Sequence, residues 1–434
     1  MSNILYLPTR YFPSISGAEF YFQRMAEILT LKFNYKIDIF TSNAIDFKAL
    51  RDPKGKVIKE NNKFHNEVNS LKINRFSIQP NISEEEILQK LKKIPSFNSL
   101  NLSDNSVKRI IKNGPYLGNL LDYFLKQENL NYELIHTTFF PYFNLIISLI
   151  VGKNINKPVI CTPFFHFSNP RYLDSSLIEV LKKFDVIIAC TNLEKEVLVK
   201  KFKIQDKKIK IISMGVDYNI FKRVHNKLLN HNYFKQNFFK KKEKNYKLVL
   251  YCGSKNYEKG TITILKSIPY ILEKFKKVYF VFIGPSTKAF NIELSKIQKL
   301  RNSRIINFSP DNLTGYYDRK KLTVFKEADL FLMPSRSDAF GIAFLEAWAS
   351  GTPVIGANIG ATPEVIRENI DGLLVKFDDP IDTAQKVIKL LKNKKLRKKL
   401  GDAGQLKVSQ NYTWEIVAEK THQTYQNIIK AKKL

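Results

Sequence analysis

The chain has 434 residues, of which 44% are hydrophobic and 12% aromatic, and this composition excludes a largely disordered protein. At about 150 residues per domain, the length predicts two or three domains. The 71 lysine and arginine residues against 40 acidic ones give a net charge of +31. Such a charge favours polyanionic partners, although a compositional bias across a whole proteome explains it equally well.

Short apolar, β-branched runs recur along the chain and predict strands buried on both faces, as in parallel sheets. In the first half the predicted strands are 3–8, 35–41, 72–78, 132–138, 157–162, 185–190 and 208–213. In the second half they are 247–252, 278–283, 304–308, 328–333, 352–357 and 372–376. Helical patterns lie between many of them, at 18–33, 118–128, 141–151, 192–203, 261–276, 341–350 and 382–400.

This alternation of strand and helix runs through twice and predicts an α/β protein with two Rossmann-like, doubly wound domains that face each other across a cleft. We place the first domain at 1–217 and the second at 246–405, with a basic linker or insertion at 218–245. Residues 406–434 are expected to hold a C-terminal helix, for which packing back on the first domain is one option. Ligands of such sheets bind beyond the carboxyl ends of the strands, so functional residues are expected there.

The cysteines and the apolar runs bear on the compartment. Cys161, Cys190 and Cys252 lie far apart within apolar runs and indicate buried free thiols in a reducing compartment. No signal peptide is expected, and the apolar stretch at 144–152 is shorter than the roughly 20 residues of a membrane-spanning helix. We therefore expect a cytoplasmic protein.

Lysine-rich segments raise the further prediction of a peripheral position on the inner face of the plasma membrane. Segments 84–93 and 108–112 mix isoleucine and leucine with basic residues at helical spacing, as a helix on an anionic bilayer would. A solvated surface helix in a lysine-rich protein has the same pattern, and residues 392–399 allow the same two interpretations.

The most informative segment is 334–355, which follows a predicted strand. A polar loop with Asp338 leads into a helix from about Gly341, and the free N–H groups at that helix start suit a diphosphate. Glu346 lies within this otherwise apolar helix, where a carboxylate is costly to bury without partners. Sugar hydroxyls would serve as partners, and so would a nearby backbone group or an arginine.

This segment resembles the acidic motif of glycosyltransferase family 4, the glycosyl transferases group 1, which are retaining enzymes of the GT-B fold. Asp338 stands eight positions before Glu346, where the family has two glutamates. The resemblance implies that Asp338 contacts hydroxyls of a donor sugar and that Glu346 contacts the nucleotide ribose. It adds the residues around the helix start to the donor site, namely Ala339, Phe340, Gly341 and Ile342.

A second element follows the first strand of the second domain, at 251–260. Read alone, its lysines are exposed by default. Beside the acidic motif it resembles the family's Gly-Arg…Lys-Gly element, which implies that Lys259 neutralises the leaving diphosphate. Ser254 stands in place of the family's arginine, and Lys255 is a candidate to compensate for it as a point charge.

Two elements of the first domain complete the candidate site. Gly17 follows the first strand in a segment similar to the family's Gly-Gly-Ala-Glu, where backbone N–H groups approach phosphate or sugar oxygens; an ordinary strand-to-helix turn is the alternative. His166 follows the strand at 157–162 and resembles the family's histidine that positions the donor sugar. A packed core histidine is the alternative, and His136 is a rival for the same role.

The resemblance therefore implies a retaining glycosyltransferase with His166, Lys259 and Asp338 as catalytic residues. The donor is expected to be a nucleotide-diphosphate sugar, and the acceptor a glycan or a lipid-linked molecule. No metal is expected, because no aspartate-rich motif is present, and no nucleic-acid partner is expected. The alternatives are a Rossmann-type nucleotide-dependent oxidoreductase, which lacks the Gly-x-Gly-x-x-Gly signature here, and a non-enzymatic polyanion-binding protein.

Overall fold

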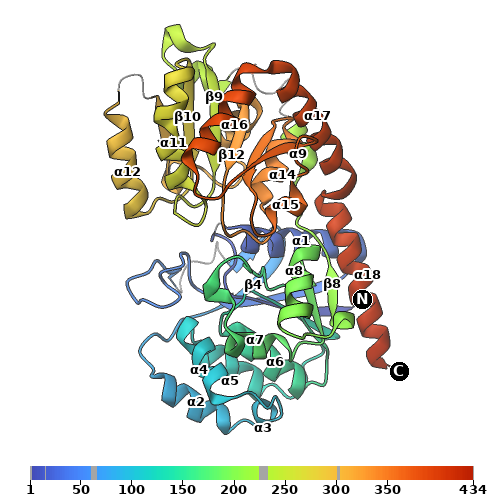
Figure 1. The fold of residues 1–434 in the computed structure, drawn as a ribbon. Helices are drawn as coiled ribbons and strands as arrows, with labels where there is room; N and C mark the ends of the chain where they lie inside the picture. Colours follow the sequence, from blue (N-terminus) through green and yellow to red (C-terminus); the bar gives the residue numbers. More distant parts are fainter. Residues whose placement is uncertain (1, 15, 60–65, 224–232, 301–303, 434) are drawn as a thin grey trace. The chain divides into compact units, whose positions relative to one another are not determined.

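The computed structural model describes residues 2–14, 16–59, 66–223, 233–300 and 304–433, and the chain divides into two compact units (Figure 1). The first unit is Met1–Ser213 together with Trp414–Leu434, and the second is Met214–Thr413. The boundary therefore falls at 213, four residues before the predicted one. The predicted linker 218–245 belongs to the second unit, and its residues 224–232 lie outside the described residues.

The first unit is built on an eight-stranded sheet in the order β3-β4-β2-β1-β5-β6-β7-β8. All neighbouring strands are parallel except β3 and β4, which are antiparallel. The strands are β1 (Asn3–Pro8), β2 (Lys36–Ser42), β3 (Glu67–Val68), β4 (Leu71–Phe76), β5 (Leu134–Thr138), β6 (Val159–Cys161), β7 (Val186–Ala189) and β8 (Ile209–Ile211). The seven predicted strands are confirmed, and β3 is a short addition.

Helices cover this sheet, and the apolar faces of those between Glu84 and Leu181 form a core with residues of β1, β5, β6 and β7. They are α1 (Gly17–Phe33), α2 (Glu84–Lys92), α3 (Pro95–Asn98), α4 (Asp104–Asn113), α5 (Gly118–Lys126), α6 (Asn144–Asn154), α7 (Ser175–Leu181), α8 (Asn192–Glu196) and α18 (Trp414–Lys433). A π-helical turn, Val197–Lys201, continues α8, and short 3-10 turns lie at Pro170–Tyr172 and Asp206–Lys208.

The C-terminal helix α18 packs against α1 within the first unit (Figure 1). The rings of Trp414 and Phe20 lie 5.9 Å apart, and the hydroxyls of Tyr425 and Tyr6 are 3.0 Å apart. Tyr425 is fully buried, so α18 is held by apolar packing and by a polar contact with the central strand β1. The chain thus returns to the first unit after the whole of the second, and α18 completes the packing around α1.

The second unit is a six-stranded parallel sheet in the order β11-β10-β9-β12-β13-β14, the strand order of a dinucleotide-binding Rossmann sheet. Its strands confirm the six predicted ones. They are β9 (Lys247–Cys252), β10 (Val278–Ile283), β11 (Ile305–Phe308), β12 (Leu330–Met333), β13 (Val354–Ala357) and β14 (Gly372–Val375).

The helices of this unit differ from the predicted ones mainly at 382–400, which is two helices and not one. Asn393 has an extended backbone and its side chain accepts a hydrogen bond of 2.8 Å from the N–H of Leu396, so it ends one helix and caps the next. The helices are α9 (Tyr218–Arg223), α10 (Tyr233–Phe238), α11 (Thr261–Lys274), α12 (Lys288–Gln298), α13 (Arg319–Glu327), α14 (Ile342–Ala349), α15 (Thr362–Val365), α16 (Pro380–Lys392) and α17 (Lys394–Asn411). Short 3-10 turns lie at Lys241–Glu243 and Pro310–Asn312.

Candidate functional site

In the second unit, the predicted site residues follow β9 and β12, the two neighbouring strands at which the strand order reverses. Such a switch point opens a crevice at the carboxyl ends of the strands. The loops beyond these strands approach each other closely, because a Cβ added at Gly260 would lie only 2.1 Å from the carbonyl oxygen of Pro334. Gly260 also has a φ of 73°, so glycine suits this position for two reasons.

Lys259 and Asp338 meet at this crossing. The Lys259 Nζ lies 2.8 Å from Asp338 Oδ2 and donates a second hydrogen bond of 2.9 Å to the carbonyl oxygen of Ser337. Both side chains are partly exposed, at 22% for Lys259 and 15% for Asp338. An ammonium has three N–H donors, and the contacts found among the described residues use two of them. One donor therefore remains available to a ligand.

The helix after Asp338 begins one residue later than predicted, at Ile342, with Gly341 as its N-cap. Gly341 has a φ of 97°, and a Cβ there would lie 2.6 Å from the Phe344 ring, so a larger residue would disturb the turn that starts the helix. Ala339 and Phe340 are buried, and Ile342 is half-buried. Any contact of Ala339 or Phe340 with a ligand would therefore be made by the backbone.

Glu346 is buried within α14 and pairs with a lysine, not with the arginine considered from the sequence. Lys321 Nζ on α13 lies 2.7 Å from Glu346 Oε1, and their side chains are 7% and 3% exposed. The ammonium also lies 3.6 Å from the centre of the Tyr316 ring. Burial, followed by the charge of Glu346, raises the pKa of Tyr316 well above its usual value. A carboxylate in this apolar helix is thus compensated by a cation from the neighbouring helix.

Lys255, the candidate to compensate for the missing arginine, has two protein partners. Its side chain is fully buried, and Nζ donates to Asn307 Oδ1 at 2.6 Å and to the carbonyl oxygen of Phe308 at 2.9 Å. Burial lowers the pKa of Lys255 to about 8. This ammonium ties the loop after β9 to the end of β11, and it is fully buried, whereas Lys259 is partly exposed. Ser254 is half-buried, and its carbonyl accepts from the Tyr251 hydroxyl.

A second ion pair joins the same two loops and was not predicted. Arg336 Nε donates to Glu258 Oε2 at 3.0 Å, and the Arg336 N–H donates to the Glu258 carbonyl at 2.8 Å. Glu258 directly precedes Lys259, and Arg336 lies two residues before Asp338. This pair fixes the approach of the loops that carry Lys259 and Asp338.

In the first unit, Gly17 and His166 lie at the carboxyl edge of the sheet, after β1 and β6. Gly17 begins α1 and is exposed. His166 is half-buried between two aromatic rings, with centres 6.3 Å away for Phe139 and 5.3 Å away for Tyr172. The side chain therefore lies near the surface of the sheet edge, as a residue that contacts a ligand requires.

Glu194 holds the loop that leads to His166 and was not predicted. Its fully buried carboxylate accepts from the N–H of Phe165 at 3.2 Å and from the N–H of Cys190 at 2.7 Å. The carboxylate thereby joins the ends of β6 and β7. The sequence did not single out Glu194, because a lone glutamate in a helix is a solvated residue by default. Only the fold brings its carboxylate to the ends of β6 and β7.

His136, the rival histidine, lies within β5 and is fully buried. Its Nε2 lies 2.8 Å from Thr162 Oγ1, and its Nδ1 contacts the hydroxyl of Tyr425 on α18. Burial lowers the pKa of His136 to about 3, so the imidazole is neutral at ordinary pH. These contacts give His136 a structural place in the attachment of α18.

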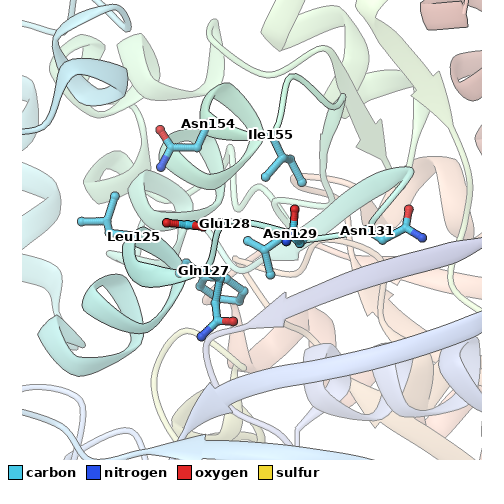
Figure 2. A pocket seen from close by; sticks show the side chains of 9 residues that line it. Leu125, Gln127, Glu128, Asn129, Asn131, Asn154 and Ile155 are labelled. Carbon is cyan, nitrogen blue, oxygen red and sulfur yellow. The ribbon is translucent and has the colours of Figure 1, made fainter.

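A cavity of about 590 Å³ lies in the first unit where the chain enters β5 and β6, at the amino ends of these strands (Figure 2). The loop between α5 and β5 and the end of α6 line it with amides and apolar side chains. Glu128 is its one ionisable lining residue among the described residues. The cavity holds none of the predicted site residues, and the two in this unit, Gly17 and His166, lie at the opposite, carboxyl edge of the sheet.

Comparisons with known proteins identify the family. Residues 83–219 match the family model described as Glycosyltransferase Family 4, and residues 233–407 match the one described as Glycosyl transferases group 1. The two stretches together cover well over half of the chain. The chain belongs to this glycosyltransferase family. The predicted resemblance is thus confirmed, and neither an oxidoreductase nor a non-enzymatic polyanion-binding protein is favoured.

Individual relatives show how far the likeness extends. The chain is 29% identical over 192 residues to a D-inositol 3-phosphate glycosyltransferase of Corynebacterium jeikeium (strain K411), which is 42% of this chain and 44% of that protein. The match therefore spans less than half the length of this relative. An uncharacterized glycosyltransferase of Methanocaldococcus jannaschii is 22% identical over 432 residues, 98% of this chain and 99% of that protein.

The fold of the family is shared over nearly the whole chain. The crystal structure of Anabaena Alr3699/HepE in complex with UDP-glucose has a TM-score of 0.70 at 13% identity, over 98% of this chain and 100% of that one. The predicted GT-B architecture of two Rossmann-like domains is therefore confirmed.

Two further properties of the described residues concern the predicted cofactor and location. Within the described ranges, no three histidine, cysteine, aspartate or glutamate side chains gather as a metal site would require. Across the same ranges, every helix is too short or too polar to cross a bilayer.

Lys321 is the main residue that sequence reasoning missed in the second unit. It shares a helix face with Val324 and Phe325, three and four residues later, and all three are buried. A lysine on the apolar face of an amphipathic helix needs a buried anion, and this spacing was the available signal.

Proposed function

We propose that this protein is a retaining glycosyltransferase that moves a sugar from a nucleotide-diphosphate sugar to an acceptor hydroxyl. The observation that carries the proposal is the Lys259–Asp338 pair at the switch point of the second unit, with one ammonium N–H still available. A cation with a donor at this edge suits a diphosphate, and a neighbouring carboxylate suits sugar hydroxyls.

The chemistry assigned to these residues follows from their charges. As the bond between the sugar and the diphosphate breaks, negative charge grows on the diphosphate, and the remaining N–H of Lys259 stabilises it. Asp338 holds the ammonium and accepts from the sugar. Glu346, held by Lys321, accepts from hydroxyls at the nucleotide end. Retention of configuration comes to this proposal from the family resemblance, and no metal is assigned to the reaction.

Gly17 and His166 of the first unit are proposed to position the sugar and the reacting oxygen. Their support is the exposure of Gly17 and the half-buried position of His166 at the carboxyl edge of the sheet. The acceptor is proposed to be a glycan or a lipid-linked molecule, with an anionic membrane surface as a further partner. The net charge of +31 supports this part of the proposal.

A donor screen tests the proposal. Release of nucleoside diphosphate and thermal stabilisation are measured with UDP-, GDP- and ADP-sugars, and the UDP sugars come first because the Anabaena protein was solved with UDP-glucose. We expect sugars of one nucleotide class to stabilise the protein. Their slow hydrolysis by water should release the nucleoside diphosphate. Stabilisation by none of them would overturn the proposal. The anomeric configuration of a product, read by NMR coupling constants, tests retention.

A further inference from the structure

Two arginines of the first unit share one neutral oxygen. Arg51, in the loop after β2, donates from Nη2 to Asn113 Oδ1 at 2.7 Å and from Nε to the Asn113 carbonyl at 3.1 Å. Arg171, in the turn after His166, donates from Nη2 to the same Oδ1 at 2.8 Å. Because both nitrogens lie this close to one oxygen, the two guanidinium groups are near neighbours of like charge.

The positive charge of this pair is not compensated locally. Among the described residues, neither guanidinium has an ion-pair partner within 4.0 Å. Arg10, in contrast, is paired with Glu19 at 2.6 Å. Partial desolvation and then the charge of Arg171 lower the pKa of Arg51, so the neighbouring residue that acts most on Arg51 is another cation. Both arginines are exposed and keep further N–H donors.

The surroundings of the pair lead to the predicted site. Burial and the neighbouring Tyr172 raise the pKa of Tyr142 to about 12. The charges of Arg51, Arg10 and Arg171 act in the opposite direction, so all three arginines lie near Tyr142. Tyr172, the residue after Arg171, stacks near His166 with ring centres 5.3 Å apart. The two guanidinium groups therefore lie at the same edge of the sheet as His166.

We infer that Arg51, Arg171 and Asn113 form a phosphate-binding subsite, and that the acceptor of the proposed reaction carries a phosphate group. Two planar guanidinium groups supply paired N–H donors that match phosphate oxygens, and a phosphate dianion balances two positive charges where a single carboxylate balances one. A phosphate bound there places the rest of a small acceptor beside His166. That the bound phosphate belongs to an acceptor rests on the proposed function. The phosphate-binding subsite itself does not.

The phosphate is available from two sources, a soluble phosphorylated sugar or a lipid headgroup, and the test separates them. Binding of methyl phosphate is measured by calorimetry at constant ionic strength, and binding to neutral vesicles with and without phosphatidic acid is measured by co-sedimentation. The variants are Arg51→Gln/Arg171→Gln and the matched control Lys54→Gln/Lys182→Gln, which removes two exposed charges from neighbouring segments.

We expect the arginine double variant to bind methyl phosphate at least tenfold more weakly than the wild type, with the control unchanged. Arg51→Lys/Arg171→Lys keeps the charge but loses the planar forks, so it should bind with intermediate affinity. If the arginine variant binds phosphatidic acid vesicles more weakly and the control does not, the phosphate belongs to a lipid. If the arginine variant loses methyl phosphate binding but binds the vesicles as before, the phosphate belongs to a soluble acceptor.

Equal methyl phosphate affinity in the arginine variant and the wild type would overturn the inference. Melting temperatures of all variants are measured, since the arginines also tie the loop after β2 and the Pro170–Tyr172 turn to the end of α4 through Asn113. Nucleoside diphosphate binding is measured on the same samples and is expected to be unchanged. Failure of that binding in the wild type would count against the proposed function and not against the phosphate subsite, so the two failures are distinguishable.

Discussion

Lys259 Nζ and Asp338 Oδ2 are 2.8 Å apart, although 79 residues separate them in sequence. Each comes from the loop beyond one of the two strands at the switch point, and the close passage at Gly260 sets their separation. A partly exposed ion pair of this kind contributes little to stability, about 1 kcal/mol or less. Its position, and the N–H that it leaves available, make it a functional candidate.

Lys259→Ala should lower turnover by about 10²-fold, because one donor to a developing charge is lost. Steady-state rates of nucleoside diphosphate release measure the effect. Lys274→Ala, which removes an exposed lysine of α11 paired with its neighbour Glu273, is the matched control and should leave the rate unchanged. A Lys259→Ala variant that is folded and as active as the control would remove Lys259 from the mechanism.

Asp338 and Glu346 should affect different parameters. Asp338→Asn is expected to lower turnover more than donor affinity, and Asp338→Glu, which restores the longer acid of the family, to shift the preference among donor sugars. Glu346→Gln is expected to weaken nucleotide binding by about 1.5–3 kcal/mol, the contribution of a charged hydrogen bond. Kinetics with several donors and nucleotide titrations measure both effects.

The Glu346 experiment needs a control for the buried pair. Glu346→Gln leaves Lys321 buried without its carboxylate, which by itself destabilises the fold. The double variant Lys321→Met/Glu346→Gln removes both charges and should recover stability while nucleotide binding stays weak. Recovery of binding together with stability would show that Glu346 acts only through the pair.

Activity should persist in excess chelator. Lys259 is the proposed partner of the diphosphate, and within the described residues no three metal-ligating side chains gather. Initial rates with EDTA, and after addition of Mg²⁺ or Mn²⁺, measure the dependence. Loss of activity with EDTA and its return with either ion would contradict the prediction.

Lys255 should make stability depend on pH in the alkaline range. Burial lowers its pKa to about 8 from an ordinary 10.5, so between these values the unfolded chain binds more protons than the folded one. This lysine therefore makes the free energy of unfolding rise from about pH 8 to 10.5. Urea denaturation of the wild type and Lys255→Met at several pH values should show a difference that changes across this window. A difference independent of pH would contradict the assignment.

Binding to anionic vesicles should be strong and should fade with salt, since each basic residue near such a surface contributes about 1 kcal/mol. The contacts of α2 and α4 indicate that such binding would come from charge and not from insertion of an apolar helix face. Their apolar faces are buried in the core, and Lys108 and Lys92 pair with Glu85 and Asp104. Co-sedimentation with neutral and anionic vesicles measures the effect. Equal binding to the two kinds of vesicle, or binding to neither kind, would support compositional bias as the origin of the positive charge.

The sequence by itself determined every strand except the two-residue β3, the two sheets and the segments that carry the second-unit site. Runs that are apolar on both faces leave little choice but a parallel sheet, and glycines such as Gly341 mark turns that other residues would strain. The spacing of Asp338 and Glu346 was also evident, because a loop and the helix that follows it keep a local pattern.

The tertiary structure alone decided which charges meet. Lys321 reaches Glu346 from another helix, Lys255 turns into the sheet edge, and Arg51 meets Arg171 across 120 residues of sequence. Local sequence carries no information about such distant partners, since the energy of a charge depends on burial and on neighbours brought by other segments. For the same reason, the helix that carries Tyr425 was predictable, but its attachment to His136 and Tyr6 was not.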